Sequence, residues 1–203
     1  MNSDQRRNIE NTIHALGDSL FSAWNYLELL KGLQLGARAD PENLQVHAIS
    51  IDVIYRAVFD ALYAVIGTVS DRAKGTLSLP NLISIGRRYS QDPEVEQVLG
   101  AARQALNDPK HAPLAKLSNW RHQHVAHRTP DSRVEEFYSN NRLQLADVEE
   151  AIGMLDRIVN DVSAALTRTC YDWRTAAEPV AGNCASLLTR NPARVELKQN
   201  ALR

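Results

Sequence analysis

The sequence has only two cysteines, Cys170 and Cys184, and they are far from the spacing of a CxxC pair. Neither a disulfide framework nor a cysteine zinc site is therefore indicated, and scarce cysteine fits a reducing compartment. Long apolar runs are also missing: no stretch approaches the roughly 20 residues of a membrane span, and the N-terminus has no apolar segment of signal-peptide type. We expect a soluble, cytoplasmic protein that has no membrane partner.

The sequence also lacks a net charge of either sign, because 23 Lys and Arg residues stand against 24 Asp and Glu residues, for a formal charge of -1. A nearly neutral chain does not coat nucleic acid through a broad basic surface, so any nucleic-acid contact must be local. A P-loop, a Rossmann glycine pattern and a GxSxG elbow are absent as well. ATPase, dehydrogenase and serine-hydrolase functions therefore have no support.

Strand patterns are nearly absent, because no sustained two-residue alternation lies between hairpin turns. Apolar residues recur instead at steps of three and four, the spacing of one helix face. The clearest set is Leu145, Val148, Ile152, Leu155, Val159, Val162 and Leu166. This spacing predicts long helices over residues 3–35, from Asp40 to about 69, from about 113, and over 145–169, with shorter helices over 80–89 and after Asp92.

Two DPE triplets, residues 40–42 and 92–94, are typical of helix starts. In each, the aspartate is a natural N-cap, the proline suits the first helical position, and the glutamate is favourable in the first turn. The stretch GARADPE, residues 36–42, which includes the first triplet, is predicted to end the first helix.

The expected fold is all-α, an up-and-down helical bundle with four long helices and one or two short connecting helices. A chain of 203 residues is long enough for one sizeable core. We expect one helical domain over residues 1–173. Beyond Trp173 the apolar residues thin out, so residues 174–203 are predicted to be a C-terminal tail that is loosely ordered or docks on a partner.

The stretch NWRHQHVAHRTPD, residues 119–131, places basic side chains where a helix should be apolar. The helix predicted from about Pro113 begins with leucines on its apolar face. The next positions on that face are Arg121, His124 and Arg128, and His127 lies at its edge. Burial of these groups without partners is very costly, which favours a wet cleft, an acidic neighbour or a subunit interface. Alternatively, the apolar stems of the arginines lie along the core edge and place the guanidinium groups in water, while the histidines form hydrogen bonds with neighbouring helices.

The same residues carry a family resemblance. Arg121 and His127, separated by five residues, resemble the R-x(4-6)-H motif of the HEPN superfamily, and VAHR, residues 125–128, is similar to the AbiU-like branch linked to phage abortive infection. The stretch DRAKGTLSLPNLI, residues 71–83, resembles the turn and short helix of that branch. The resemblance spans about residues 10–170.

Members of that superfamily are helical bundles that commonly dimerise through the motif helix, and many are metal-independent ribonucleases with a composite site. The resemblance therefore implies a homodimer, an RNA substrate, no metal or other cofactor, and a role in phage defence or in a toxin-antitoxin pair with a neutralising protein partner.

The chemistry of such a site suggests a role for each residue. Histidine titrates near neutrality, so His127 is assigned to acid-base work, whereas the permanently charged Arg121 suits stabilisation of the phosphoryl group. The two lie about 9 Å apart along one helix and roughly 120° apart around it, so a two-fold pairing of helices would bring residues of both chains together. His124 and Arg128 are candidates for binding flanking phosphates.

Two other functions stay open at this point. The bundle can be a non-catalytic nucleotide-binding or protein-interaction module, or His122, His124 and His127 can bind a metal, although no His-Glu-x-x-His context completes such a site. The tryptophans are interpreted as packing anchors. Asp71 and Arg72 lie at a predicted turn, where the expected role is an N-terminal cap or a surface salt bridge.

Overall fold

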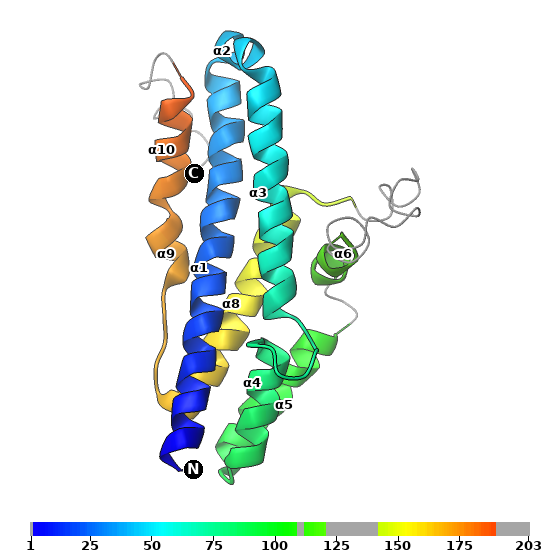
Figure 1. Ribbon diagram of the computed structural model, residues 1–203, viewed down its shortest axis with the longest axis vertical. Coiled ribbons are helices and arrows are strands. Elements are labelled where there is room, and N and C mark those ends of the chain that lie inside the picture. Colours follow the sequence, from blue (N-terminus) through cyan, green and yellow to red (C-terminus); the bar gives the residue numbers. More distant parts are fainter. Residues whose placement is uncertain (1, 109–111, 121–141, 190–203) are drawn as a thin grey trace. The chain divides into compact units, whose positions relative to one another are not determined.

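The computed structural model describes residues 2–108, 112–120 and 142–189 (Figure 1). Within these ranges every regular element is a helix and no strand occurs, so the predicted all-α helical bundle is confirmed. The helices are α1 (Ser3–Ala39), α2 (Pro41–Val46), α3 (Ala48–Val69), α4 (Leu79–Tyr89), α5 (Pro93–Asn107), α6 (Ala112–Trp120), α8 (Leu145–Thr167), α9 (Trp173–Ala177) and α10 (Pro179–Leu187). None of the helices described there combines the length and the apolar character needed to cross a bilayer.

Both DPE triplets start helices as predicted. The Asp40 Oδ1 atom accepts a hydrogen bond from the backbone N–H of Asn43 at 3.1 Å, and the Asp92 Oδ1 atom accepts one from the N–H of Glu94 at 2.9 Å. Each proline follows its cap at the beginning of α2 or α5. These caps satisfy N–H groups that have no carbonyl partner inside the helix.

The helix expected from Asp40 to residue 69 is interrupted, which corrects the prediction. The helical path breaks at His47, whose N–H donates to the carbonyls of both Asn43 and Leu44, and α3 then begins at Ala48. The first helix runs further than predicted, to Ala39 rather than to residue 35. Gly36 does not end it, because its missing side chain makes room for a neighbouring residue: a Cβ atom there would lie 2.9 Å from the Cβ of Leu188.

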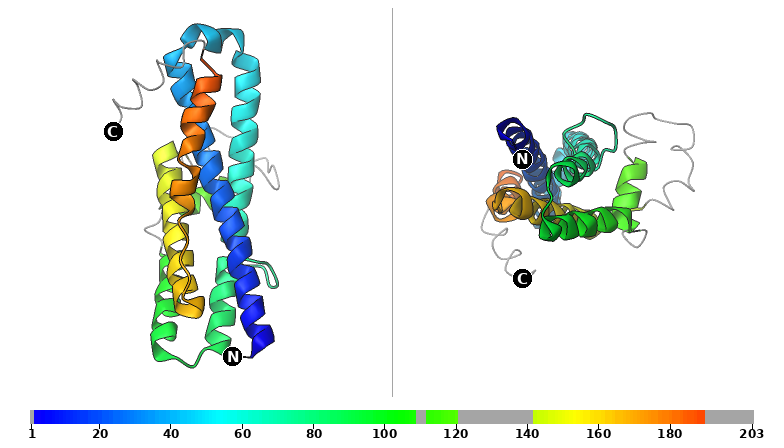
Figure 2. Two further views of the ribbon diagram at one scale, coloured as in Figure 1. Left: turned by 90° about the vertical axis from the view of Figure 1, so that its left-hand side faces the viewer. Right: turned by 90° about the horizontal axis from the view of Figure 1, so that it is seen from below.

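The chain divides into two compact units, one of residues 1–20 and 63–172 and the other of residues 21–62 and 173–203. In the first unit, α8 contacts α4, α5 and α6, and α4 also contacts α5 (Figure 2). The predicted apolar face of α8 is buried: Val148, Ile152, Leu155, Val159 and Val162 have no exposed surface. Burial of one such side chain stabilises a fold by about 1.5–3 kcal/mol, so this face is the main anchor of the unit.

The second unit contains residues that we expected in a loosely ordered or partner-bound tail. The segment after Trp173 forms α9 and α10, and Ala185 of α10 is buried in a cluster with Leu35 and Ala39 of α1. The amide Nδ2 of Asn43 donates to the Leu188 carbonyl at 2.6 Å. The first part of the predicted tail is therefore helical and packed against α1, while residues 190–203 lie outside the described residues.

Candidate functional site

The predicted site residues Arg121, His124, His127 and Arg128 lie outside the described residues, as does His122 of the metal hypothesis. The helix that leads to them is described, and it begins at Ala112, close to the predicted start. Its contacts show how the chain is held immediately before Arg121.

Helix α6 is anchored in the first unit on its predicted apolar face. Leu117 is almost completely buried, and α6 contacts α8. The ring of Trp120 stacks on the ring of Tyr63, with 5.8 Å between centroids and an interplanar angle of 6°. Trp120 is thus a packing anchor, as predicted, and it fixes the point at which the chain enters the motif.

The far side of the motif segment returns to the same helix. The Nζ atom of Lys116 in α6 donates to the carbonyl of Arg142 at 3.2 Å, and Arg142 lies just before α8. The residues that flank the undescribed stretch 121–141 are therefore joined by a hydrogen bond.

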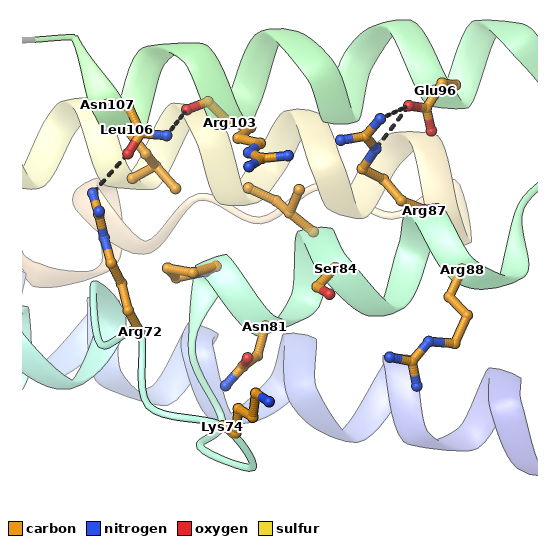
Figure 3. A pocket seen from close by; sticks show the side chains of 12 residues that line it. Arg72, Lys74, Asn81, Ser84, Arg87, Arg88, Glu96, Arg103, Leu106 and Asn107 are labelled. Carbon is orange, nitrogen blue, oxygen red and sulfur yellow. Dashed lines mark hydrogen bonds and ion pairs between the residues drawn. The ribbon is translucent and has the colours of Figure 1, made fainter.

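A second candidate site lies entirely within the first unit, in a cleft of about 760 Å³ formed by the turn over residues 71–78, α4 and α5 (Figure 3). A volume of this size is typical of ligand sites. The lining side chains comprise five cations and one carboxylate: Arg72, Lys74, Arg87, Arg88, Arg103 and Glu96. In Figure 3 Arg72 and Lys74 lie toward one end of the cleft, whereas Arg87 and Arg88 lie toward the other.

The cations of the cleft differ in how they are partnered. Arg87 pairs with Glu96, with 2.7 Å between its Nε atom and Oε1, while Arg72 donates from Nη2 to the neutral side-chain oxygen of Asn107 at 2.7 Å. Over the part of the chain that the structure covers, Lys74, Arg88 and Arg103 make no ion pair, and all three are exposed. The cleft therefore carries a local excess of positive charge that solvent, rather than protein carboxylates, balances.

The turn that carries Arg72 and Lys74 is held in place by one side chain of α4. The Nδ2 atom of Asn81 lies within hydrogen-bonding distance of the Ala73 carbonyl at 2.7 Å, the Thr76 carbonyl at 3.0 Å and the Thr76 hydroxyl at 2.9 Å. Gly75 supplies the left-handed backbone, with φ of 83°. The positions of the two cations are thus coupled to the start of α4.

The cleft combines binding groups without a catalytic set. Among its lining residues there is no histidine, cysteine or aromatic side chain, and its acidic residue is engaged by Arg87. No group of three or more potential metal-binding side chains occurs in the ranges that the structure describes. The arrangement can hold an anion, but it offers no acid-base pair for cleavage.

Sequence reasoning did not identify this cleft. For Asp71 and Arg72 it expected an N-terminal cap or a surface salt bridge at a turn. The Arg72 guanidinium binds Asn107, and the Asp71 carboxylate accepts a 2.9 Å hydrogen bond from the N–H of Ala73 within the turn, where no helix begins. The cations come from three separate segments that have no common spacing. The adjacent Arg87 and Arg88 near the end of α4 are the one local signal.

Comparison with known proteins adds a family. A family model of the HEPN group, described as AbiU2, matches residues 7–185. The matched range contains the turn over residues 71–78, the cleft and the segment with Arg121 and His127. No curated protein and no solved structure matches the chain.

Proposed function

The chain belongs to the AbiU2 family of HEPN domains, a group related to abortive infection, and from this premise we propose that it is a metal-independent endoribonuclease of phage defence or of a toxin-antitoxin pair. The observation that carries the proposal is the position of Arg121 and His127, with five residues between them, directly after the anchored helix α6 of a HEPN chain. Such an enzyme acts in the cytoplasm, where its RNA substrates are.

In this proposal each residue has one task. His127 transfers the proton to or from the reacting oxygens, and the planar guanidinium of Arg121 stabilises the charge that develops on the phosphoryl group. His124 and Arg128 bind the flanking phosphates. A two-fold homodimer combines Arg121 of one chain with His127 of the other, and a neutralising protein partner keeps the activity in check.

The proposal is tested by induced expression of the wild type and of His127→Ala. The wild type is expected to stop growth and to fragment cellular RNA, and the substitution is expected to abolish both effects because it removes the acid-base group. His47→Ala is the matched control, since that histidine is exposed at the bend between α2 and α3. Expression level, helical content and oligomeric state are compared for all three proteins.

A mixture of two inactive variants tests the composite site. If each site takes Arg121 from one chain and His127 from the other, mixed dimers of Arg121→Ala and His127→Ala contain one intact site. An equimolar mixture should then recover about a quarter of the wild-type rate. No recovery, with mixed dimers demonstrated, would place both residues of each site in one chain.

A non-catalytic binding module is the second candidate, and the basic cleft without an acid-base pair favours it. In that case wild-type and His127→Ala cells keep the same intact RNA and grow alike. The chain would then act by holding an anionic ligand rather than by cleaving it.

A further inference from the structure

We propose that the cleft between the turn over residues 71–78, α4 and α5 is a docking site for the phosphodiester backbone of an RNA strand. The identity of the nucleic acid rests on the proposed function, whereas the preference for a chain of phosphates follows from the cleft itself. The site is separate in sequence from the segment that carries Arg121 and His127.

Charge is the first argument. Five cations and one carboxylate line one cleft of a chain whose formal net charge is only -1, so the cleft is more positive than the chain as a whole. Lys74, Arg88 and Arg103 have no carboxylate partner among the described side chains, and they can exchange water for phosphate without breaking an ion pair. Arg72 keeps its charge, because the Asn107 side chain that it contacts is neutral.

Length is the second argument. On the α5 wall the lining residues extend from Glu96 to Asn107, which corresponds to roughly 16 Å at 1.5 Å per residue. Arg72 lies toward one end of this wall and Arg87 and Arg88 lie toward the other, with Arg103 between them (Figure 3). Phosphates of one strand follow one another about every 3.4 Å along a nucleic-acid helix, so a strand can engage both ends at once. A single nucleotide, whose phosphates are grouped at one end, cannot do so.

The lining also indicates which part of the strand is bound. No aromatic side chain among the lining residues offers a platform on which a base can stack. Pro80 and Leu106 supply apolar surface that suits sugar rings, while the guanidinium groups suit phosphate oxygens. Binding is therefore expected to depend on the backbone and to have little sequence preference.

The turn gives the site a fixed geometry. Because Asn81 ties Ala73 and Thr76 to the first turn of α4, Lys74 is presented from an ordered segment rather than from a free loop. Less conformational freedom is then lost when the strand binds.

The first experiment measures fluorescence anisotropy of a labelled 16-nucleotide RNA with the full chain carrying His127→Ala, so that the probe stays intact. Three or four phosphate contacts predict a slope of log K against log salt of about -2 to -3 for a single strand. Between about 50 and 200 mM salt the affinity should fall roughly 20- to 50-fold. A slope near zero overturns the proposal.

Charge reversal locates the contact. Arg88→Glu and Arg103→Glu should each weaken binding about tenfold or more, the effect of losing one charge-assisted hydrogen bond, and each should make the slope shallower by about 0.7. The matched control is Arg157→Glu, because Arg157 is exposed on α8 and does not line the cleft. Equal losses in all three variants would mean that RNA responds only to total charge, and the docking site would be rejected.

A variant that binds RNA more tightly distinguishes a direct effect of charge on RNA binding from a loss of binding through misfolding. Glu96→Gln removes the carboxylate that neutralises Arg87, so RNA should bind several-fold tighter and the slope should steepen by about 0.7. Glu150→Gln, an exposed position on α8, is the matched control. No gain over that control contradicts the proposal, since a damaged fold cannot produce tighter binding.

The ligand class is tested with three competitors: unlabelled 16-nucleotide RNA, a 16-nucleotide DNA of the same sequence, and ATP as a compact polyphosphate. Displacement by RNA at lower concentration than by ATP supports a strand, and displacement by ATP at the same concentration overturns it. DNA that binds tenfold tighter than RNA overturns RNA as the ligand.

Failure of this proposal is distinguishable from failure of the proposed function. If His127→Ala abolishes cleavage while Arg88→Glu and Arg103→Glu bind RNA normally, the ribonuclease stands and the cleft is not its docking site. If the wild type leaves RNA intact but the cleft variants lose RNA binding, the docking site stands without the cleavage.

Discussion

Gly32→Ala tests the packing of α1 against α10, the contact that orders the segment after Trp173. A Cβ atom at Gly32 would lie 2.6 Å from the Ala181 carbonyl oxygen and 2.8 Å from the Cβ of Cys184. These neighbours are a backbone atom and a Cβ, which cannot rotate away, so the two helices must separate. Overpacking of this kind costs about 1–3 kcal/mol, whereas the higher helix propensity of alanine contributes about 1 kcal/mol in the opposite direction.

The same substitution at Gly153 isolates the contact. Gly153 in α8 has no atom within 4 Å of the position that a Cβ would take, so Gly153→Ala should stabilise the protein by about 0.5–1 kcal/mol through helix propensity alone. Gly32→Ala should lower the free energy of unfolding by up to about 2 kcal/mol, and the two variants should differ by about 1–3 kcal/mol, which is the cost of overpacking alone. Urea unfolding followed by circular dichroism measures both values. If Gly32→Ala were as stable as Gly153→Ala, the close approach of α10 to α1 would be refuted.

Two further predictions concern the cleft and the thiols. Asn81→Ala leaves the carbonyls of the turn without their donor, so it should lower the free energy of unfolding by about 1–2 kcal/mol and weaken RNA binding. Urea unfolding measures the first effect and fluorescence anisotropy measures the second. An unchanged RNA affinity would contradict the coupling of Lys74 to α4. Burial raises the pKa of the Cys184 thiol. At a pH below that pKa, a smaller fraction of Cys184 is in the reactive thiolate form than without burial. Iodoacetamide at about pH 8 should label the exposed Cys170 first, Cys184 should react faster as the pH rises, and equal labelling by mass spectrometry would contradict its burial.

The long helices were predictable because large apolar residues mark their buried faces. The five residues Val148, Ile152, Leu155, Val159 and Val162 of α8 follow one three-and-four pattern, and all are buried. The caps were also predictable, since an aspartate before a proline acts through bonds within a few residues. Both signals are local in sequence.

The C-terminal end of the first helix and the helical order of the segment after Trp173 were missed for one reason. Small residues give no periodic signal, yet Gly32, Gly36 and Ala185 pack where α10 approaches α1, a contact between residues about 150 positions apart. A glycine that a sequence suggests as a helix end is here required for close packing. The segment after Trp173 is likewise ordered by small side chains rather than by large apolar ones.

The candidate site was predictable only in part. The basic residues from Arg121 to Arg128 are close in sequence and stand out against a helical pattern, so the sequence alone is enough to propose them as candidates. The cations of the cleft are brought together by the packing of α4 and α5 and by a turn that Asn81 holds in place. Their spacing in the sequence follows no pattern that predicts this arrangement. The assignment of Arg121 and His127 stays a prediction, because residues 121–141 lie outside the described ranges.

The composition of the cleft also shapes how an anionic partner arrives. Five of the chain's 23 Lys and Arg residues line it, with one of its 24 Asp and Glu residues, so the remaining sequence is distinctly acidic. The cleft attracts a polyanion within about 10 Å at moderate ionic strength. The net charge near zero is therefore the sum of a positive cleft and a negative remainder. The positive cleft attracts an anionic partner before any specific contact forms.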